Sequence, residues 1–301
     1  RDKVLKFEGG YHGMSDYSLM SLAPKTLSNF PQAIPDSPGI PKKVSEEVIV
    51  APFNDTDMFK SILDEHHEQL GAVIVEPFQR LIPPAPGFLE VLRDMTLKYD
   101  IPLIFDEIVT GFRFAYGGAQ EFYSVTPDLC SLGKIIGGGF PLAAVGGRKD
   151  LMQLFNTDAV GDKHFLPQIG TLSGNPVASA AGLATLEILK PKSAYETVFD
   201  TGRVLMGELE AAMKDYGHSA VILGEPPLFD VFFTDNEISD YRGILKADTK
   251  KGSAFNKLLR SNQVFKGDSK FYVSLAHNED DVNLTVKAIS CLLYTSDAAD
   301  E

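Results

Sequence analysis

The chain has 301 residues, 44% of them hydrophobic, which is enough to fill the core of one large domain and a smaller one. Its formal net charge of −13 argues against a nucleic-acid partner, because binding a phosphate backbone requires a basic surface. No apolar run reaches the roughly eighteen residues of a membrane span, no signal peptide is recognisable, and two cysteines provide no disulfide framework. We therefore expect a cytoplasmic protein whose partner is neither a membrane nor a nucleic acid.

The two ends of the chain do not resemble natural termini. The sequence begins without Met and is already within a strand pattern at residue 4, so we expect an N-terminally truncated fragment. Residues 291–301 interrupt the amphipathic helix pattern of residues 280–290 and resemble the translated adapter of a sequencing library. We expect this last segment to be a non-native tail.

Short β-branched segments alternate with helical patterns in the first 190 residues, as is typical of βαβ units in a parallel sheet. A domain boundary is expected near residues 190–193, and residues 191–290 alternate helices with short strands, which predicts a smaller α+β domain. Before the boundary, the predicted strands are residues 47–52, 72–76, 101–106, 128–131 and 142–146, and the helices are residues 55–70 (capped by Asp55 or Thr56), 88–99 and 177–189. After it, we predict a helix over residues 194–216 and strands over residues 220–223, 229–233 and 271–275.

Three features near the ends of the predicted strands indicate a charged cofactor. Glu76 and Asp106 each end a buried strand, and open α/β sheets bind ligands at that edge. Lys134 follows the next strand and leads into three consecutive glycines, whose backbone amides suit a phosphate. Pyridoxal phosphate needs all three kinds of group: a carboxylate that keeps its pyridine nitrogen protonated, an amine for its aldehyde, and donors for its phosphate.

Several long motifs, in a consistent order, resemble the class III pyridoxal-phosphate-dependent aminotransferases, and most of all glutamate-1-semialdehyde 2,1-aminomutase and its aminotransferase relatives. They are residues 105–113 (FDEIVTGFR), 116–120 (YGGAQ), 126–129 (TPDL), 132–141 (LGKIIGGGFP) and 170–176 (GTLSGNP), with residues 11–13 (YHG) and 275–277 (LAH) nearer the ends. This resemblance covers residues 3 to about 289 and implies an α/β fold like that of aspartate aminotransferase, fold type I of the pyridoxal-phosphate enzymes. Residues 1–190 would then be part of the large cofactor-binding domain, with a mostly parallel sheet, and residues 191–290 the small C-terminal domain.

The resemblance also implies catalytic roles for two residues. Lys134 matches the lysine that joins the cofactor aldehyde and moves a proton between the substrate and the cofactor. Asp106 matches the acid that pairs with the pyridine nitrogen. Glu107 should face away from Asp106, because successive side chains of a strand point to opposite faces.

Five further residues match positions around the cofactor. Tyr11 resembles the aromatic that stacks on the ring, with His12 beside it, Ile108 packs on the other face, and Glu76 supports the pocket floor. Thr171 resembles the residue that reaches the phosphate bound by a neighbouring subunit, which implies a homodimer with shared active sites. From the residues alone, Thr171 could instead cap the helix that follows it, although Ser173 is better placed to do so.

The implied reaction is amino-group transfer on a small amino acid, amino-aldehyde or amine, either to a separate acceptor or within one substrate, as in an aminomutase. A racemase of the same fold would also use Lys134 but would leave the amino group in place. An inactive structural fragment is the third alternative, because the N-terminal phosphate-binding motif of the family has no counterpart in the chain. His66, His67 and Glu68 occupy adjacent helix positions that point in different directions, so no metal site is predicted.

Several positions depart from the patterns of the family. Val109 stands where many of its transaminases have Gln, and Leu81 where a Glu is usual. Residues 263–272 contain Asp268 but no Glu, whereas the aminomutases carry an acid late in the chain. These departures leave the choice between transaminase and aminomutase open.

Overall fold

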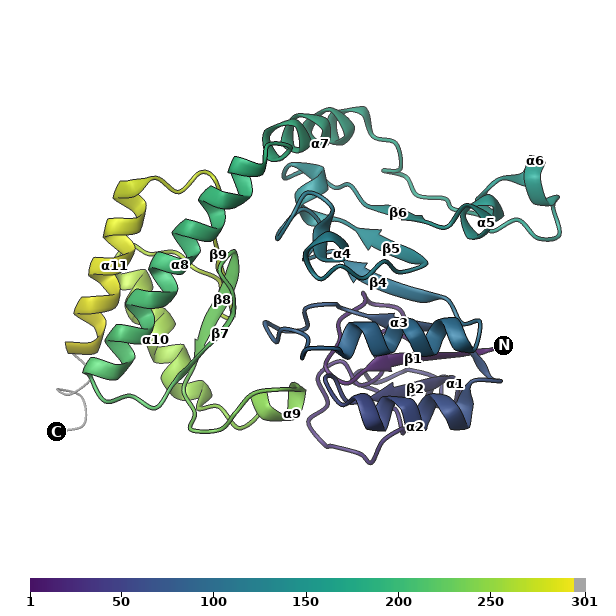
Figure 1. The fold of residues 1–301 in the computed structure, drawn as a ribbon, viewed down its shortest axis with the longest axis horizontal. Helices are drawn as coiled ribbons and strands as arrows, with labels where there is room; N and C mark the ends of the chain where they lie inside the picture. The colour runs from purple at the N-terminus through teal and green to yellow at the C-terminus, as the bar shows by residue number, and fades with distance from the viewer. Residues whose placement is uncertain (295–301) are drawn as a thin grey trace. The chain divides into compact units, whose positions relative to one another are not determined.

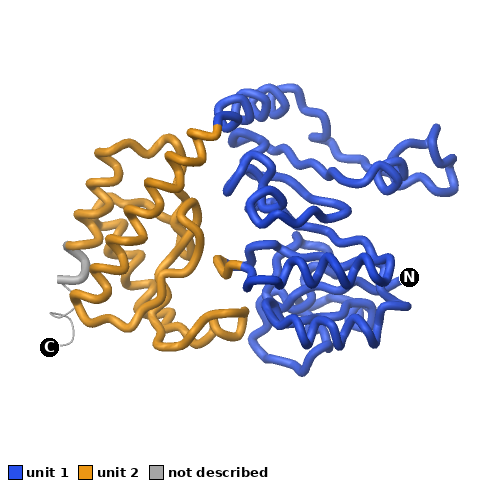
Figure 2. The backbone as a smooth tube through the Cα atoms, viewed as in Figure 1, with its two compact units in different colours: residues 1–80, 84–191 blue, residues 81–83, 192–301 orange. Residues whose placement is uncertain are grey.

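The computed structural model describes residues 1–294, with side chains as far as residue 290. The chain forms two compact units (Figure 2). The first comprises residues 1–80 and 84–191, and the second comprises residues 81–83 and the chain from residue 192 onward. In the described part of the chain, no helix combines the length and the hydropathy of a membrane span.

One six-stranded sheet forms the centre of the first unit, in the order β2-β1-β3-β4-β5-β6. Neighbouring strands are parallel except for β5 and β6, which confirms the predicted mostly parallel sheet. The strand β2 is buried at every position, as expected where helices or loops cover both faces of a parallel sheet. The six strands are β1 (Lys3–Phe7), β2 (Val48–Ala51), β3 (Leu70–Val75), β4 (Leu103–Glu107), β5 (Leu129–Leu132) and β6 (Ala144–Gly147).

Two helices, α2 (Thr56–His66) and α3 (Phe88–Lys98), lie side by side over the sheet (Figure 1). The carboxylate of Asp55 caps α2 by accepting the backbone N–H of Met58 at 2.9 Å, so Asp55 and not Thr56 is the cap. The prediction that this helix continues to residue 70 is wrong. Fully buried Leu70 instead starts β3 and pairs with β1, and pairing with the sheet outweighs the helical pattern.

The remaining helices of the first unit are short, apart from α7 (Pro176–Leu189). Asn175 caps α7, since its side-chain oxygen accepts the backbone N–H groups of Val177 and Ala178. The short helices are α1 (Val44–Glu47), α4 (Gly118–Phe122), the 3₁₀ helix η1 (Lys134–Gly137), α5 (Lys149–Met152), the 3₁₀ helix η2 (Gln153–Phe155) and α6 (Thr157–Val160). The sequence pattern missed α1, which turns the chain immediately before β2.

A cluster of four phenylalanines fills the core between β1 and the helices α2 and α3. Phe7 contacts Phe53, Phe59 and Phe88 with ring-centroid distances of 5.5 to 6.1 Å. All four side chains are buried, so each contributes roughly 2 to 3 kcal/mol of hydrophobic stabilisation. This packing fixes β1, whose C-terminal end leads into the segment that carries Tyr11 and His12.

The second unit packs helices against a three-stranded antiparallel sheet in the order β7-β8-β9. Its elements are α8 (Lys192–Asp215), β7 (Val221–Glu225), β8 (Leu228–Phe232), α9 (Tyr241–Ile244), α10 (Thr249–Ser261), β9 (Phe271–Tyr272) and α11 (Glu279–Tyr294). The helix α11 continues through residue 294, past residue 290 where its pattern was expected to end. The rest of the predicted non-native tail, residues 295–301, lies outside the described residues.

A buried ion pair lies within the second unit. The ammonium of Lys266 donates to Asp230 at 2.9 Å, to the side-chain oxygen of Asn256 at 2.7 Å and to the carbonyl of Gly267 at 3.0 Å. The Lys266 and Asp230 side chains are only 3% and 7% exposed. Burial lowers the pKa of Lys266 and raises that of Asp230, and the attraction between the two opposes both shifts.

We expect Lys266→Met to lower the free energy of unfolding by about 3 kcal/mol, because it leaves Asp230 as a buried charge without its partner. The double variant Lys266→Met with Asp230→Asn should recover part of this loss, since no buried charge remains. Denaturant unfolding followed by circular dichroism measures both, with Lys257→Met, an exposed position on α10, as the control. If Lys266→Met and the control had equal free energies of unfolding, the ion pair of Lys266 with Asp230 would not stabilise the protein.

Candidate active site

A pocket of about 480 Å³ opens in the first unit, where β3, β4 and β5 end. Because the carboxyl ends of parallel strands meet at one edge of a sheet, side chains distant in the sequence converge there. Six of the seven predicted site residues line this pocket, namely Tyr11, His12, Glu76, Asp106, Ile108 and Lys134. The sequence prediction did not include Phe78, Val109, Cys130 and Ser131, which also line it.

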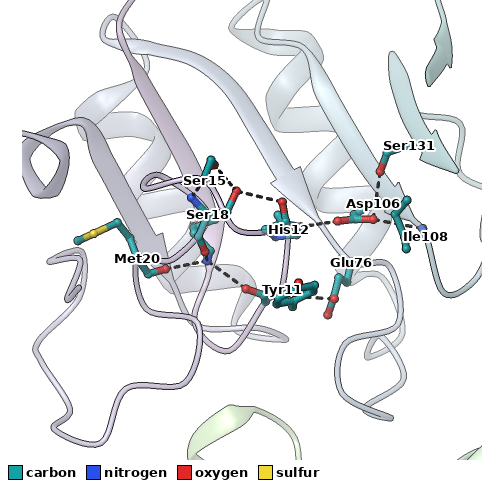
Figure 3. A network of polar contacts seen from close by, with 11 residues as sticks. Tyr11, His12, Ser15, Ser18, Met20, Glu76, Asp106, Ile108 and Ser131 are labelled. Atoms are coloured by element: carbon teal, nitrogen blue, oxygen red, sulfur yellow. Dashed lines mark hydrogen bonds and ion pairs between the residues drawn. The ribbon is translucent and has the colours of Figure 1, made fainter. Parts of the chain in front are cut away.

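Asp106, on β4, is the centre of the polar contacts in the pocket (Figure 3). One carboxylate oxygen lies 2.8 Å from Nδ1 of His12, and the other accepts the Ser131 hydroxyl at 3.0 Å and the Ile108 backbone N–H at 3.2 Å. Burial disfavours the charged carboxylate, but these hydrogen bonds outweigh burial and hold the pKa of Asp106 below its ordinary value. Asp106 is therefore an ionised acid although its side chain is only 7% exposed.

Ser131 completes the Asp106 site, and sequence reasoning missed it. In the parallel pairing of β4 with β5, Ser131 is the direct partner of Asp106. A serine in a short apolar strand gives no sign of this role by itself, because the register of β4 and β5 has to be known first. Once the register is known, the hydroxyl of Ser131 is the donor nearest to the acid on the neighbouring strand.

His12 and Tyr11 reach the pocket from the segment that follows β1. The His12 side chain is 4% exposed, and its Nδ1 must carry the proton of the bond to Asp106, because an ionised carboxylate can only accept. The backbone N–H of Tyr11 donates to Glu76 at 3.4 Å (Figure 3). Tyr11 as a residue is 46% exposed. The two neighbouring residues thus differ in exposure: His12 is buried against Asp106, whereas Tyr11 is partly exposed.

Lys134 begins the 3₁₀ helix η1 with a left-handed backbone, φ +47°. This conformation is costly for a residue other than glycine and persists where the surroundings fix it. The helix α7 provides this constraint by packing against η1. A Cβ atom at Gly182 of α7 would lie 2.3 Å from the Ile136 carbonyl, and one at Gly138 would lie 2.8 Å from the Ala181 carbonyl. The close approach of two backbones therefore holds the turn that carries Lys134.

Glu107 lies on the opposite face of β4 from Asp106, as strand geometry predicts. It is fully buried and accepts the Thr110 hydroxyl at 3.1 Å, the Ala119 backbone N–H at 2.6 Å and the Gln120 side-chain amide at 2.8 Å. The carboxylate thereby fixes the start of α4 behind the strand. A Cβ atom at Gly118, where φ is +72°, would lie 2.2 Å from this carboxylate, so the turn needs glycine.

Thr171 does not line the pocket that contains Lys134. It lies in a neighbouring cavity of about 990 Å³ in the same unit, and Ile108, Ser131 and Val145 line both. The alternative that Thr171 or Ser173 caps the following helix is wrong, because Asn175 is the cap.

Residues 1–252 match the family described as aminotransferase class-III. Glutamate-1-semialdehyde 2,1-aminomutase of Pelotomaculum thermopropionicum is 41% identical over 294 residues, which cover 96% of this chain and 66% of that protein. The protein of the same name from Thermodesulfovibrio yellowstonii is 42% identical, over 96% of this chain and 67% of its own length. The chain thus spans about two thirds of the curated relatives that it matches.

The solved structures agree with this result. An omega-transaminase from Sphaerobacter thermophilus is similar with a TM-score of 0.90 and 32% identity, over 98% of this chain and 68% of that chain. A transaminase with pyridoxal phosphate bound has a TM-score of 0.89 and 26% identity, over 99% of this chain and 68% of that chain. The fold and these matches place the chain among the aminotransferases. More narrowly, it belongs to the class III aminotransferases, as the sequence motifs predicted.

We expect Ser131→Ala to raise the pKa of Asp106, because the carboxylate loses a donor. A carboxyl group with a lowered pKa stabilises the fold above its ordinary pKa, and this contribution is lost as the pH falls towards the folded-state value. The variant should therefore be less stable than the wild type by about 1 kcal/mol at neutral pH, and the difference should shrink below about pH 4. Denaturant unfolding at several pH values measures this.

Ser61→Ala is the matched control for this prediction, because Ser61 is exposed on α2 and distant in sequence from any residue of the pocket. It should show no pH-dependent difference from the wild type. A deficit of the same size for Ser131→Ala at neutral and acidic pH would mean that the hydroxyl does not stabilise the charged form of Asp106.

Proposed function

We propose that the protein transfers amino groups with pyridoxal phosphate, and that Lys134 and Asp106 are its catalytic residues. The observation that carries this proposal is the shared pocket, in which an ionised buried carboxylate and a lysine amine line one cavity of about 480 Å³. That volume lies within the range of small-molecule and cofactor sites, roughly 300 to 1,000 Å³.

The residues of the pocket fit pyridoxal phosphate. Asp106 has the charge that a protonated pyridine nitrogen needs, and His12 and Ser131 keep that charge in place. Ile108 supplies an apolar wall, and Tyr11, which is partly exposed, supplies an aromatic ring. Glu76 holds the backbone of Tyr11. Each group matches the polarity of the part of the cofactor that it would contact.

When bound, pyridoxal phosphate supplies an aldehyde that condenses with amines and a ring that accepts electrons. Lys134 would hold the cofactor through its amine, and the same amine, once free, would take the proton from the substrate Cα and later give it back. Asp106, as a carboxylate, would keep the pyridine nitrogen protonated. His12, through Nδ1, keeps Asp106 oriented and charged.

The substrate class is a small amino acid, amino-aldehyde or amine. The two curated relatives are named as aminomutases, and the two solved structures as transaminases. Both reactions need an amine and a carboxylate of the kind that this pocket provides, and they differ in where the amino group goes. Transfer to a separate acceptor and transfer to the adjacent carbon of the same substrate are therefore the two forms of this proposal.

We also propose a cytoplasmic homodimer with shared active sites, in which Thr171 reaches the cofactor phosphate of the partner subunit. The second cavity supports this, because it adjoins the first and contains Thr171. Apolar side chains are exposed around it, with Ile169 at 90% and Leu172 at 53% exposure, which is typical of a surface that another chain covers. The net charge of −13 supports the absence of a nucleic-acid partner.

Lys134→Ala should abolish the visible absorbance band of lysine-bound pyridoxal phosphate and lower the rate of amino-group transfer by about 100- to 10,000-fold. Absorbance spectra and single-turnover assays of the purified protein measure the two effects. Lys163→Ala, an exposed lysine of the same unit, is the control and should behave as the wild type. An unchanged spectrum in Lys134→Ala would refute the role of Lys134.

Product analysis separates the two forms of amino-group transfer. With glutamate-1-semialdehyde as the only substrate, an aminomutase forms product without any added acceptor. A transaminase needs a keto acid and releases a new carbonyl compound. Exchange of the Cα proton with no carbonyl product at all would indicate a racemase and contradict amino-group transfer.

A further inference from the structure

Lys6, on β1, is buried to an extent that is unusual for a lysine, with only 2% exposure. Its ammonium donates three hydrogen bonds, all to backbone carbonyls. The acceptors are Gly10 at 3.0 Å, Ser18 at 2.8 Å and Met20 at 2.7 Å. Lys6 therefore binds the segment that follows its own strand.

In the sequence, the three acceptor carbonyls flank Tyr11 and His12, the two residues of this segment that line the pocket. Gly10 directly precedes Tyr11 and His12, whereas Ser18 and Met20 stand beyond them in the chain. The Ser18 hydroxyl also donates to the His12 carbonyl at 3.0 Å, which extends the contact from Lys6 to His12 (Figure 3). Residues 8–19 contain no helix or strand, and a few backbone hydrogen bonds, such as those from Gly9 to Ser21 and from Leu19 to Ser15, hold this segment together with the side-chain donors.

We propose that Lys6 is a positioning residue, whose ammonium holds residues 10–20 in the conformation that puts His12 against Asp106. The relevance of this contact to catalysis rests on the proposed function, whereas the contact itself needs no cofactor.

The number of acceptors indicates the charged form of the side chain. An ammonium has three N–H donors, one for each carbonyl, whereas a neutral amine has two and would turn a lone pair towards the third carbonyl. The charged groups that act on Lys6 are Glu76 and Asp36, which favour the ammonium, and Arg80, which disfavours it. Burial lowers the pKa of Lys6 to about 8, so the ammonium persists at neutral pH.

Gly10 shows how tightly the segment is packed. A Cβ atom there would lie 3.0 Å from Nε2 of His12, 3.1 Å from the Phe7 carbonyl and 3.3 Å from the side-chain oxygen of Gln79. The carbonyl that Lys6 binds therefore belongs to a residue in close contact with the His12 ring. A shift of Gly10 moves the imidazole that bonds Asp106.

The test compares Lys6→Met with Lys3→Met in the 301-residue chain without cofactor. Met removes every donor while keeping the length of the side chain, and Lys3 is the matched control on the same strand. Lys6→Met should accelerate backbone hydrogen exchange in residues 10–20 by at least about tenfold, because the bonds from a charged donor are lost. It should also shift or broaden the NMR signal of the His12 Nδ1 proton, and Lys3→Met should do neither.

Equal exchange rates and an unchanged His12 signal in the two variants would overturn the proposal. If Lys6→Met does not fold, ¹⁵N-lysine NMR at neutral pH decides. The wild type should show two ammonium signals that are protected from solvent exchange, one from Lys6 and one from Lys266, and Lys266→Met should remove only the second. Absence of the signal that remains in Lys266→Met would also overturn the proposal. These measurements do not involve Lys134 or pyridoxal phosphate. Their failure therefore leaves the proposed function open, and failure of the Lys134 experiment leaves the role of Lys6 open.

Discussion

A charged carboxylate in the interior of the sheet is the constraint around which the site is organised. Only 7% of the Asp106 side chain is exposed, so protein donors must replace most of its hydration, or the acid would take up a proton. The donors come from three places: His12 from the segment after β1, Ser131 from β5, and the backbone of Ile108 from the end of β4. These hydrogen bonds therefore connect the segment after β1 and the strand β5 to the end of β4.

The adjacent acids of β4, Asp106 and Glu107, lie on opposite faces of the sheet and have different roles. Asp106 faces the pocket, and Glu107 faces the opposite layer, where it holds the turn before α4. Both are buried and both accept several hydrogen bonds, but of the two only Asp106 lines the pocket that contains Lys134. Because successive side chains of a strand point to opposite faces, Asp106 is available to a ligand, whereas Glu107 stabilises the turn before α4.

The sequence predicted the parts of this architecture that depend on local pattern and motif. The β-branched runs revealed β2, β3 and β4, and the motif around Lys134 and Asp106 identified the family and brought the two residues together as candidates. What it could not predict depends on contacts between distant segments. The role of Ser131 can be predicted only when the register of β5 against β4 is known. The end of α2 at His66 follows from the pairing of β3 with β1. The capping role of Asn175 follows from the position at which α7 starts.

Lys6 illustrates the same limit most clearly. In the sequence it is one polar residue in a strand that alternates with apolar ones, and that pattern is usual for a strand face open to solvent. The structure buries it because the segment after β1 folds back and offers three carbonyls at one point. Nothing local to residue 6 encodes that fold-back, which depends on the packing of residues 8–22.

The close approach of α7 to η1 has a practical consequence for engineering. Replacing glycine by alanine inside a helix is a common route to higher thermal stability, because it reduces the freedom of the unfolded chain. Gly182 would be selected by that rule, yet the carbonyl of Ile136 occupies the space a methyl group would need. Gly207 of α8 has no atom within 4 Å of that space and accepts the same change without this conflict.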